Sequence, residues 1–491
     1  MNKTVVINPG SGDLYSGFPR VTAQIWTEDH PFPEQFIGSL PAMPTLVEQY
    51  RNWQSIYQAL CNRKHLLSRS LQVDDELEID EGSITNVSVV SFDELCQQLE
   101  ESLNAWQKSE GYLNISRQVR SHLNPDSQVR VILETNDDLL RRLPWHRCDF
   151  FRDYPQAEIA LSQPEYQRLR TSQPKLPKNK VRILAVLGNS QGIDLEAEIS
   201  FLQSLPDAEV VFLVQPSCQE LNAHLWNSAG WDILFFAGHS QTEGETGRIY
   251  INENPTDNSL TIEQLEESLK AALEKNLKLA IFNSCDGLGL ANALGKLHIP
   301  LAIVMREPVP NRVAQIFFQN FLSAFAIEKL PVYLAVNKAR RQLQALEDEF
   351  PAASWLPMIC QNPAVEPPTW VQLGGVSGCS DRDLFALQKW ENIGKNEGGL
   401  LRGQPLTNAE YWLHKPIDEV SFKDKHFIEL FVKLRDNEIN KRRRKWAIAA
   451  SLRGGLVLVL MLTGIALWQL KLGQVSQMEA GRHFIHYSQC S

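Results

Sequence analysis

Two residues capable of nucleophilic chemistry each follow a short apolar run. His239 comes just after residues 233–237 (ILFFA), and Cys285 comes just after residues 279–283 (LAIFN), 46 residues further along the chain. Short, continuous apolar runs closed by small or polar residues are typical of buried parallel strands. In open α/β sheets, ligands bind in the crevice outside the carboxyl ends of the strands. A thiol and an imidazole delivered to one such edge could form a catalytic pair.

The chemistry of this pair would start from the thiolate, which is the nucleophilic form of cysteine. An imidazole can take the thiol proton and return it to a leaving amine. A helix expected to begin near Leu288 would also stabilise a thiolate at Cys285. The backbone N–H of Cys285, with one from the turn formed by Gly238 and Ser240, could hold an oxyanion. The alternative for either residue alone is a structural role, because cysteine is among the most buried residue types.

The elements expected around these residues alternate between strands and helices, which predicts a parallel sheet with helices on both faces. The expected strands are residues 181–187, 209–214, 233–237, 279–283 and 301–305. The expected helices are residues 195–205, 218–227, 262–275, 288–297 and 311–325, with a hairpin around 248–251. Before this region, periodicity predicts strands at 20–26 and 129–133 and helices at 46–60, 92–106 and 139–143.

Composition argues against several other classes of protein. The net charge of −10 does not favour sequence-independent binding of nucleic acid, so we expect no nucleic-acid partner. The eight cysteines are scattered singly, without CxxC pairs, and predict neither a metal site nor a disulfide framework. No P-loop, dinucleotide fingerprint or G-x-S-x-G elbow occurs, and we expect no cofactor.

An apolar segment near the C-terminus predicts a membrane anchor. Residues 446–470 follow a basic block at 441–445, and Trp446 and Trp468 flank the apolar run. About 20 apolar residues span a bilayer core, and snorkelling of Arg453 would extend the shorter uninterrupted run. We therefore expect a single transmembrane helix over 446–470, with the preceding domains in the cytoplasm by the positive-inside rule. The alternative is a buried core helix.

Both motifs resemble those of the CHAT family, which are bacterial caspase-like proteins of the clan that includes caspases, metacaspases and separase. The resemblance rests on FFAGHS at residues 235–240 and FNSCDG at residues 282–287. The cysteine motif, with a histidine about 50 residues upstream, is also similar to the caspase signature. The likeness continues through residues 303–308, 334–340 and 354–357, and residues 143–145 are similar to a segment that precedes the family's core.

The resemblance implies a caspase-like α/β fold in which His239 is the general base and Cys285 the nucleophile. Two departures limit the comparison. Ser240 stands where the family usually has glycine, and its side chain narrows the conformations of the oxyanion-hole backbone. Asn283 stands where relatives specific for basic residues have an acid, so we assign no specificity for a basic P1 residue. Asp286 and Glu307 are candidate substrate-binding acids, with solvated surface carboxylates as the alternative.

The predicted organisation has five parts. Residues 1–171 form an N-terminal α/β region that is expected to include a catalytically silent half of the caspase-like fold, and residues 180–365 form the CHAT domain. Residues 366–445 are a linker and juxtamembrane helix, 446–470 the transmembrane helix, and 471–491 a short tail. The expected function is a membrane-tethered cysteine endopeptidase in regulated signalling or stress response, acting on polypeptides and activated by a protein partner. The alternatives are a catalytically degenerate membrane-anchored scaffold or sensor, and an intact dyad with few substrates.

Overall fold

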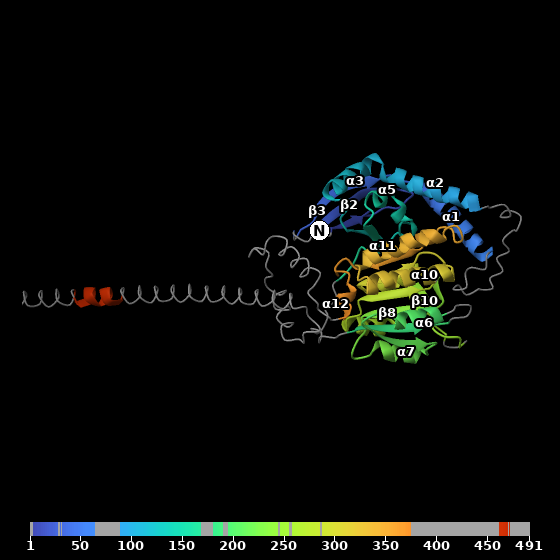
Figure 1. The fold of residues 1–491 in the computed structure, drawn as a ribbon. Helices are drawn as coiled ribbons and strands as arrows, with labels where there is room; N and C mark the ends of the chain where they lie inside the picture. The colour runs from blue at the N-terminus through green and yellow to red at the C-terminus, as the bar shows by residue number, and fades with distance from the viewer. Residues whose placement is uncertain are drawn as a thin grey trace, which may run out of the picture. The chain divides into compact units, whose positions relative to one another are not determined.

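The computed structural model divides into two compact units, residues 1–377 and residues 378–491. It describes residues 3–27, 30, 32–63, 89–167, 180–189, 195–243, 246–254, 258–284, 287–374, 461–469 and 471. In the first unit, strands and helices build a layered α/β structure around one large sheet (Figure 1).

The large sheet has eleven strands in the order β3-β2-β1-β4-β5-β14-β13-β12-β8-β6-β7. Their bounds are β1 (Lys3–Asn8), β2 (Phe18–Thr27), β3 (Glu34–Leu40), β4 (Val129–Glu134), β5 (Ala157–Ser162), β6 (Val181–Leu187), β7 (Ala208–Val214), β8 (Ile233–Ala237), β12 (Leu279–Asn283), β13 (Leu301–Met305) and β14 (Pro357–Gln361). A second sheet contains β9 (Ser240–Glu243), β10 (Thr246–Tyr250) and β11 (Ser259–Thr261).

The strands at the centre of the C-terminal half are buried on both faces. Every residue of β8, β12 and β13 is buried, which explains why their sequences are continuous apolar runs without alternation. The predicted bounds of these three strands and of β6 agree with the structure. The α/β fold class predicted from these runs is confirmed.

The sheet is mixed, although most of its strand pairs are parallel. β1, β2 and β3 pair antiparallel, and β14 runs antiparallel to β13. The predicted parallel sheet is therefore confirmed for most strand pairs and corrected for these antiparallel ones. The physical reason is that β14 aligns with the strands of the N-terminal half: it runs parallel to β5, while β5 and β4 run parallel to each other.

In the first unit, twelve α-helices are described, and they flank the sheet. Their bounds are α1 (Pro44–Arg63), α2 (Val89–Gln107), α3 (Glu110–His122), α4 (Asp138–Arg142), α5 (Asp149–Asp153), α6 (Glu196–Gln203), α7 (Cys218–Leu225), α8 (Glu266–Glu274), α9 (Leu288–Lys296), α10 (Asn311–Leu322), α11 (Val332–Gln342) and α12 (Trp370–Gly374). α6, α10 and α11 contact β7, β12 and β5, while α7 packs on α8 and α9 on β13 and β14. Short helical turns include η1 (Trp145–Arg147) and η4 (Ala353–Trp355).

The N-terminal half and the C-terminal half share one sheet and one hydrophobic core. β5 and β14 join them through the pairs Ala160 with Ile359 and Leu161 with Cys360. The indole of Trp53 in α1 stacks on the ring of Trp355 with centroids 5.4 Å apart. The first 171 residues thus contribute a continuous part of the same sheet.

In the second unit, residues 461–469 are helical, and they form part of the predicted transmembrane segment. Residues 446–460 and 470 of that segment, and the predicted juxtamembrane helix, lie outside the described residues. Within the part of the chain that the structure describes, no helix is both long enough and apolar enough to span a bilayer.

Candidate active site at the ends of β8 and β12

The two strands that lead to His239 and Cys285 are direct neighbours. β8 and β12 pair in parallel along their whole length, and their last pair is Ala237 with Asn283. The amide of Gly238 donates to the carbonyl oxygen of Asn283 across 3.4 Å, so the pairing continues past the strand ends. The prediction that both strands end at one edge of one sheet is confirmed.

His239 is only 2% exposed and lies between β8 and the hairpin of β9 and β10. Its carbonyl oxygen accepts a hydrogen bond from the amide of Tyr250 across 3.0 Å, which ties the histidine backbone to the end of β10. Ser240 is 4% exposed and begins β9, where it pairs with Ile249. The predicted hairpin therefore directly follows the candidate base.

Gly238 is required by the turn between Ala237 and His239. Its φ is +157°, and a Cβ there would lie 3.1 Å from the ring of Phe236 and 3.2 Å from the Cα of Gly188. A side chain would strain this backbone conformation and collide with the loop that follows β6. The glycine thus allows β8 to deliver His239 beside the end of β6.

Cys285 and Asp286 lie outside the described residues. On their N-terminal side, Ser284 is completely buried, and its Oγ has no hydrogen-bond partner in the described part of the chain. On their C-terminal side, the amide of Gly287 donates to the carbonyl oxygen of Met305 across 2.9 Å. α9 begins at Leu288, where the sequence predicted a helix. The flanking backbone is therefore anchored to β12 on one side and to β13 on the other.

The segment after His239 and the segment after Cys285 also contact each other. The hydroxyl of Thr242 in β9 accepts a hydrogen bond from the amide of Gly289, in the first turn of α9, across 3.2 Å. A Cβ on Gly247 in β10 would lie 2.5 Å from the backbone nitrogen of Leu290. The hairpin and α9 are thus packed backbone to backbone. This contact fixes the segment that follows β8 relative to the segment that follows β12.

Sequence reasoning missed a buried carboxylate behind this edge. The side-chain amide of Asn283 donates to Oε1 of Glu198 across 3.2 Å, and the amide of Gln315 donates to Oε2 across 3.3 Å. Glu198 is 4% exposed. The sequence did contain a signal for the burial of Glu198. It lies three residues after Leu195 and four before Leu202, and this spacing places it on the apolar face of α6.

Glu307, a candidate substrate-binding residue, is turned toward the N-terminal half. Its side chain is 1% exposed and accepts hydrogen bonds from the hydroxyl of Tyr50 at 2.6 Å and from Nη1 of Arg142 at 2.9 Å. The amide of Gln54 also donates to both carboxylate oxygens. Burial, followed by the charge of Glu307, raises the pKa of Tyr50 well above its usual value. Glu307 is therefore neither a solvated carboxylate nor open to a substrate in this arrangement.

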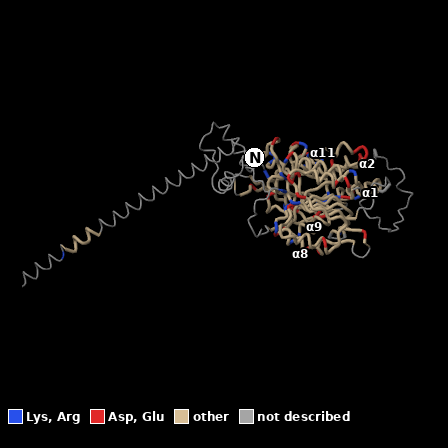
Figure 2. The backbone as a smooth tube through the Cα atoms, turned by 60° about the horizontal axis from the view of Figure 1, so that its bottom comes forward, with Lys and Arg blue, Asp and Glu red and all other residues tan. Residues whose placement is uncertain are grey.

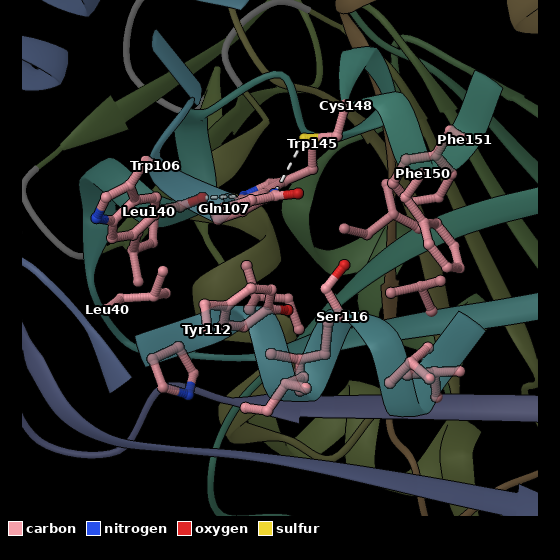
Figure 3. Close-up of a pocket in the computed structure, with 18 of the residues that line it drawn as sticks. Leu40, Trp106, Gln107, Tyr112, Ser116, Leu140, Trp145, Cys148, Phe150 and Phe151 are labelled. Carbon is pink, nitrogen blue, oxygen red and sulfur yellow. Dashed lines mark hydrogen bonds between the residues drawn. The ribbon is translucent and has the colours of Figure 1, made fainter. Parts of the chain in front are cut away.

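Three other thiols in the described part of the chain, those of Cys96, Cys148 and Cys360, are poor candidates for the nucleophile. Burial raises the pKa of Cys96 to about 12 and also raises the pKa of Cys148 and of Cys360. The sulfur of Cys148 accepts a hydrogen bond from Nε2 of Gln107 across 3.1 Å. Cys148 and Gln107 line an apolar cavity of about 80 Å³ between α3 and the N-terminal strands (Figure 3). Such surroundings favour the neutral thiol.

No cluster of three or more histidine, cysteine, aspartate or glutamate side chains suited to a metal ion occurs among the described residues.

The large sheet and the neighbouring ends of β8 and β12 define an α/β protein. The model of the CHAT domain family matches residues 112–376. Because this match covers more than half of the 491 residues, the chain belongs to the CHAT domain family. This family is associated with caspase-like cysteine peptidases. A search of curated proteins finds no match to the chain.

Proposed function

We propose that this protein is a caspase-like cysteine endopeptidase in which His239 is the general base and Cys285 the nucleophile. The observation that supports the proposal is the register of β8 and β12. Ala237 and Asn283 are paired, and each candidate catalytic residue follows its strand by two positions. Neighbouring strands lie about 4.8 Å apart, so chains that leave two such strands in step can bring their side chains into contact.

In the proposed reaction, the imidazole of His239 takes the thiol proton of Cys285. The sulfur then attacks the carbonyl carbon of the scissile peptide bond, and the carbonyl oxygen becomes an oxyanion. The backbone amide of Cys285 and one amide of the turn from Gly238 to Ser240 hold this oxyanion. The amide of Gly238 itself donates to the carbonyl oxygen of Asn283. When the C–N bond breaks, the imidazolium gives its proton to the leaving amine. Water, deprotonated by the imidazole, then cleaves the thioester and restores the thiol.

The substrate class we propose is a polypeptide, without an assigned P1 residue. Asn283 points its amide toward Glu198, and the carboxylate of Glu307 is occupied by Tyr50, Gln54 and Arg142. Asp286 therefore remains the candidate substrate-binding acid beside the nucleophile. No cofactor enters the proposed reaction.

The alternative function is that of a catalytically degenerate CHAT module that acts as a scaffold or sensor. Ser240, in place of the family's usual glycine, is the observation that favours it. Ser240 is buried at the start of β9, where its side chain restricts the backbone that would supply an oxyanion-hole amide. A scaffold would keep the fold and the hairpin but would have no reactive thiolate.

We further propose that the chain is tethered to a membrane with its folded domains in the cytoplasm, and that a protein partner activates it. The support for the membrane tether and its orientation is the apolar run within 446–470 and the basic block at 441–445. Residues 461–469 are helical, and their large apolar side chains, such as Leu467 and Trp468, are exposed.

The experiment that tests the peptidase is a survey of new protein N-termini in cells that express the full chain. Wild type is compared with Cys285→Ala, His239→Ala and the control Cys218→Ala, which alters a half-buried cysteine on α7. The proposal predicts termini that appear with wild type and Cys218→Ala and are absent with the other two variants. The same set of termini in all four samples would favour the scaffold.

A further inference from the structure

A cavity outside the candidate active site has four arginines among its thirteen lining residues. It has a volume of about 430 Å³ and lies between η1, α5, the start of β5 and the C-terminal part of α11. Its charged lining residues are Arg147, Arg152, Arg340, Arg341 and a single carboxylate, Glu158. We call this site the arginine cavity. Elsewhere in the first unit, Lys/Arg and Asp/Glu are interspersed (Figure 2), so the excess of positive charge at the cavity is a local feature.

The carboxylate of Glu158 does not neutralise all the arginines of the cavity, because it is already paired with Arg340. Nε and Nη2 of Arg340 donate to the two oxygens of Glu158 at 3.2 and 3.3 Å, and both side chains are buried. A third nitrogen of Arg340 donates to the carbonyl oxygen of Ser354. This buried pair forms a fixed wall of the cavity.

The other arginines are less committed. Arg147 forms an ion pair with Glu100 at 2.6 Å, and Arg152 forms one with Asp149 at 3.3 Å, in which Arg152 is 70% exposed. The pair of Arg147 is only partly exposed, and its guanidinium also lies 5.9 Å from the centre of the Trp355 ring. The exposed pair of Arg152 stabilises the protein by about 1 kcal/mol at most. Arg341 is exposed, and its side chain forms no ion pair or hydrogen bond with any residue that the structure describes. Its guanidinium is therefore available to a ligand.

His146 provides an independent indication of a ligand. Both ring nitrogens are buried, and neither has a hydrogen-bond partner in the described part of the chain, although the residue lines the cavity. Burial, and then the charges of Arg340, Arg306 and Arg147, hold the pKa of His146 well below its usual value. The ring is therefore neutral and has one N–H to donate. Buried donors without partners are costly, and a bound acceptor would remove that cost.

We propose that the arginine cavity binds a small molecule that carries a phosphate group. Guanidinium groups match phosphate oxygens in a fork geometry, and Arg341 and Arg152 can approach from the open side. The N–H of His146 can donate to the same group from the interior. The volume exceeds that of a phosphate ion, which leaves room for an organic portion.

The arginine cavity lies on the same sheet edge as the candidate active site, but it is separate from it. Strand pairing through β14 places Glu158 level with Met305 at the end of β13. β5 is three strands away from β12, which corresponds to about 14 Å. The proposal is therefore independent of whether the protein is a peptidase.

Calorimetric titration of the full chain at constant ionic strength tests this proposal. Inorganic phosphate, glycerol phosphate and a phosphoserine tripeptide are the probes, with sulfate for comparison. The variants are Arg341→Gln, Arg152→Gln and the control Arg20→Gln, which alters an exposed arginine on β2. We expect saturable binding of a phosphate probe, weakened about tenfold or more in the first two variants, because a charged hydrogen bond contributes about 1.5 kcal/mol or more. Arg20→Gln should bind like wild type.

Binding of glycerol phosphate but not of the tripeptide identifies a free phosphorylated compound as the ligand. Binding of the tripeptide alone supports recognition of phosphate but identifies a phosphorylated protein as its source. A bound probe should also raise the melting temperature of wild type more than that of Arg341→Gln. Absence of saturable binding at millimolar concentrations, or equal binding by Arg341→Gln and Arg20→Gln, would overturn the proposal.

Discussion

The side-chain amide of Asn283 lies 3.2 Å from a carboxylate oxygen of Glu198, and both residues are buried beside the end of β12. This contact connects the strand that precedes Cys285 with α6. Gln315 in α10 donates to the other oxygen of the same carboxylate at 3.3 Å. The candidate nucleophile therefore follows a strand whose last side chain is fixed by two helices.

Asn283→Asp should make stability depend on pH. The variant places a second carboxylate beside Glu198, and two buried like charges at this distance cannot both stay ionised. The folded variant then holds a proton that the unfolded chain releases above about pH 4, so its stability falls as pH rises from 5 to 8. Chemical denaturation at several pH values measures this. Asn283→Ala, which should lose about 1–3 kcal/mol with little added pH dependence, is the control.

Gly238→Ala should destabilise the fold and disturb the site. The added Cβ would meet Phe236 and Gly188 at a positive φ, which predicts a loss of about 1–3 kcal/mol in the free energy of unfolding. Gly374→Ala is a matched control, because a Cβ there makes only ordinary contacts, the nearest at 3.6 Å. Equal unfolding free energies for the two variants would contradict the role given to Gly238.

The strands predicted most accurately from the sequence are those that are covered on both faces of the sheet. β8, β12 and β13 are buried on both faces, so burial alone makes them short apolar runs, and β6 departs from this only at the half-buried Arg182. β14 escaped notice because it begins with Pro357 and includes Cys360 and Gln361 within five residues. Its pairing with β5 depends on two segments that are almost 200 residues apart, which no local pattern specifies.

The candidate site was predictable as far as its strand ends, but not in its surroundings. His239 was found because it ends an apolar run, whereas Glu198 is recognised as part of the site only through its hydrogen bond with Asn283. Glu307 was expected to face either substrate or solvent. Its actual partners, Tyr50 and Arg142, come from helices more than 150 residues away in sequence.

Arg142→Gln should destabilise the protein more than Glu307→Gln. Removal of the arginine leaves a buried carboxylate without its cation, for which about 3–5 kcal/mol is expected, whereas Glu307→Gln removes the charge itself. Denaturant unfolding of both single variants and of the double variant measures the coupling. The double variant should be less destabilised than the sum of the single variants. Strict additivity would contradict this account of the contact.

His146 should contribute to the loss of stability in acid. Its lowered pKa in the folded state means that the unfolded chain binds more protons just below the usual value of 6.5. Stability should therefore fall as pH drops below 6.5, by as much as about 1.4 kcal/mol per pH unit from this residue. His146→Gln should show a shallower decline between pH 6.5 and 5, while the exposed control His30→Gln should keep the wild-type slope. A wild-type slope in His146→Gln would contradict the prediction.

The most direct test of the proposed dyad is the rate at which iodoacetamide alkylates Cys285 between pH 5 and 9, followed by mass spectrometry of its peptide. The full chain is compared with His239→Ala and with His224→Ala, a control on α7 that precedes β8 and lies toward its opposite end. Wild type and His224→Ala should react rapidly at neutral pH. His239→Ala should react at least about tenfold more slowly at pH 7 and recover only above about pH 8, where an ordinary thiol ionises. An unchanged rate and pH dependence in His239→Ala would contradict the proposed dyad.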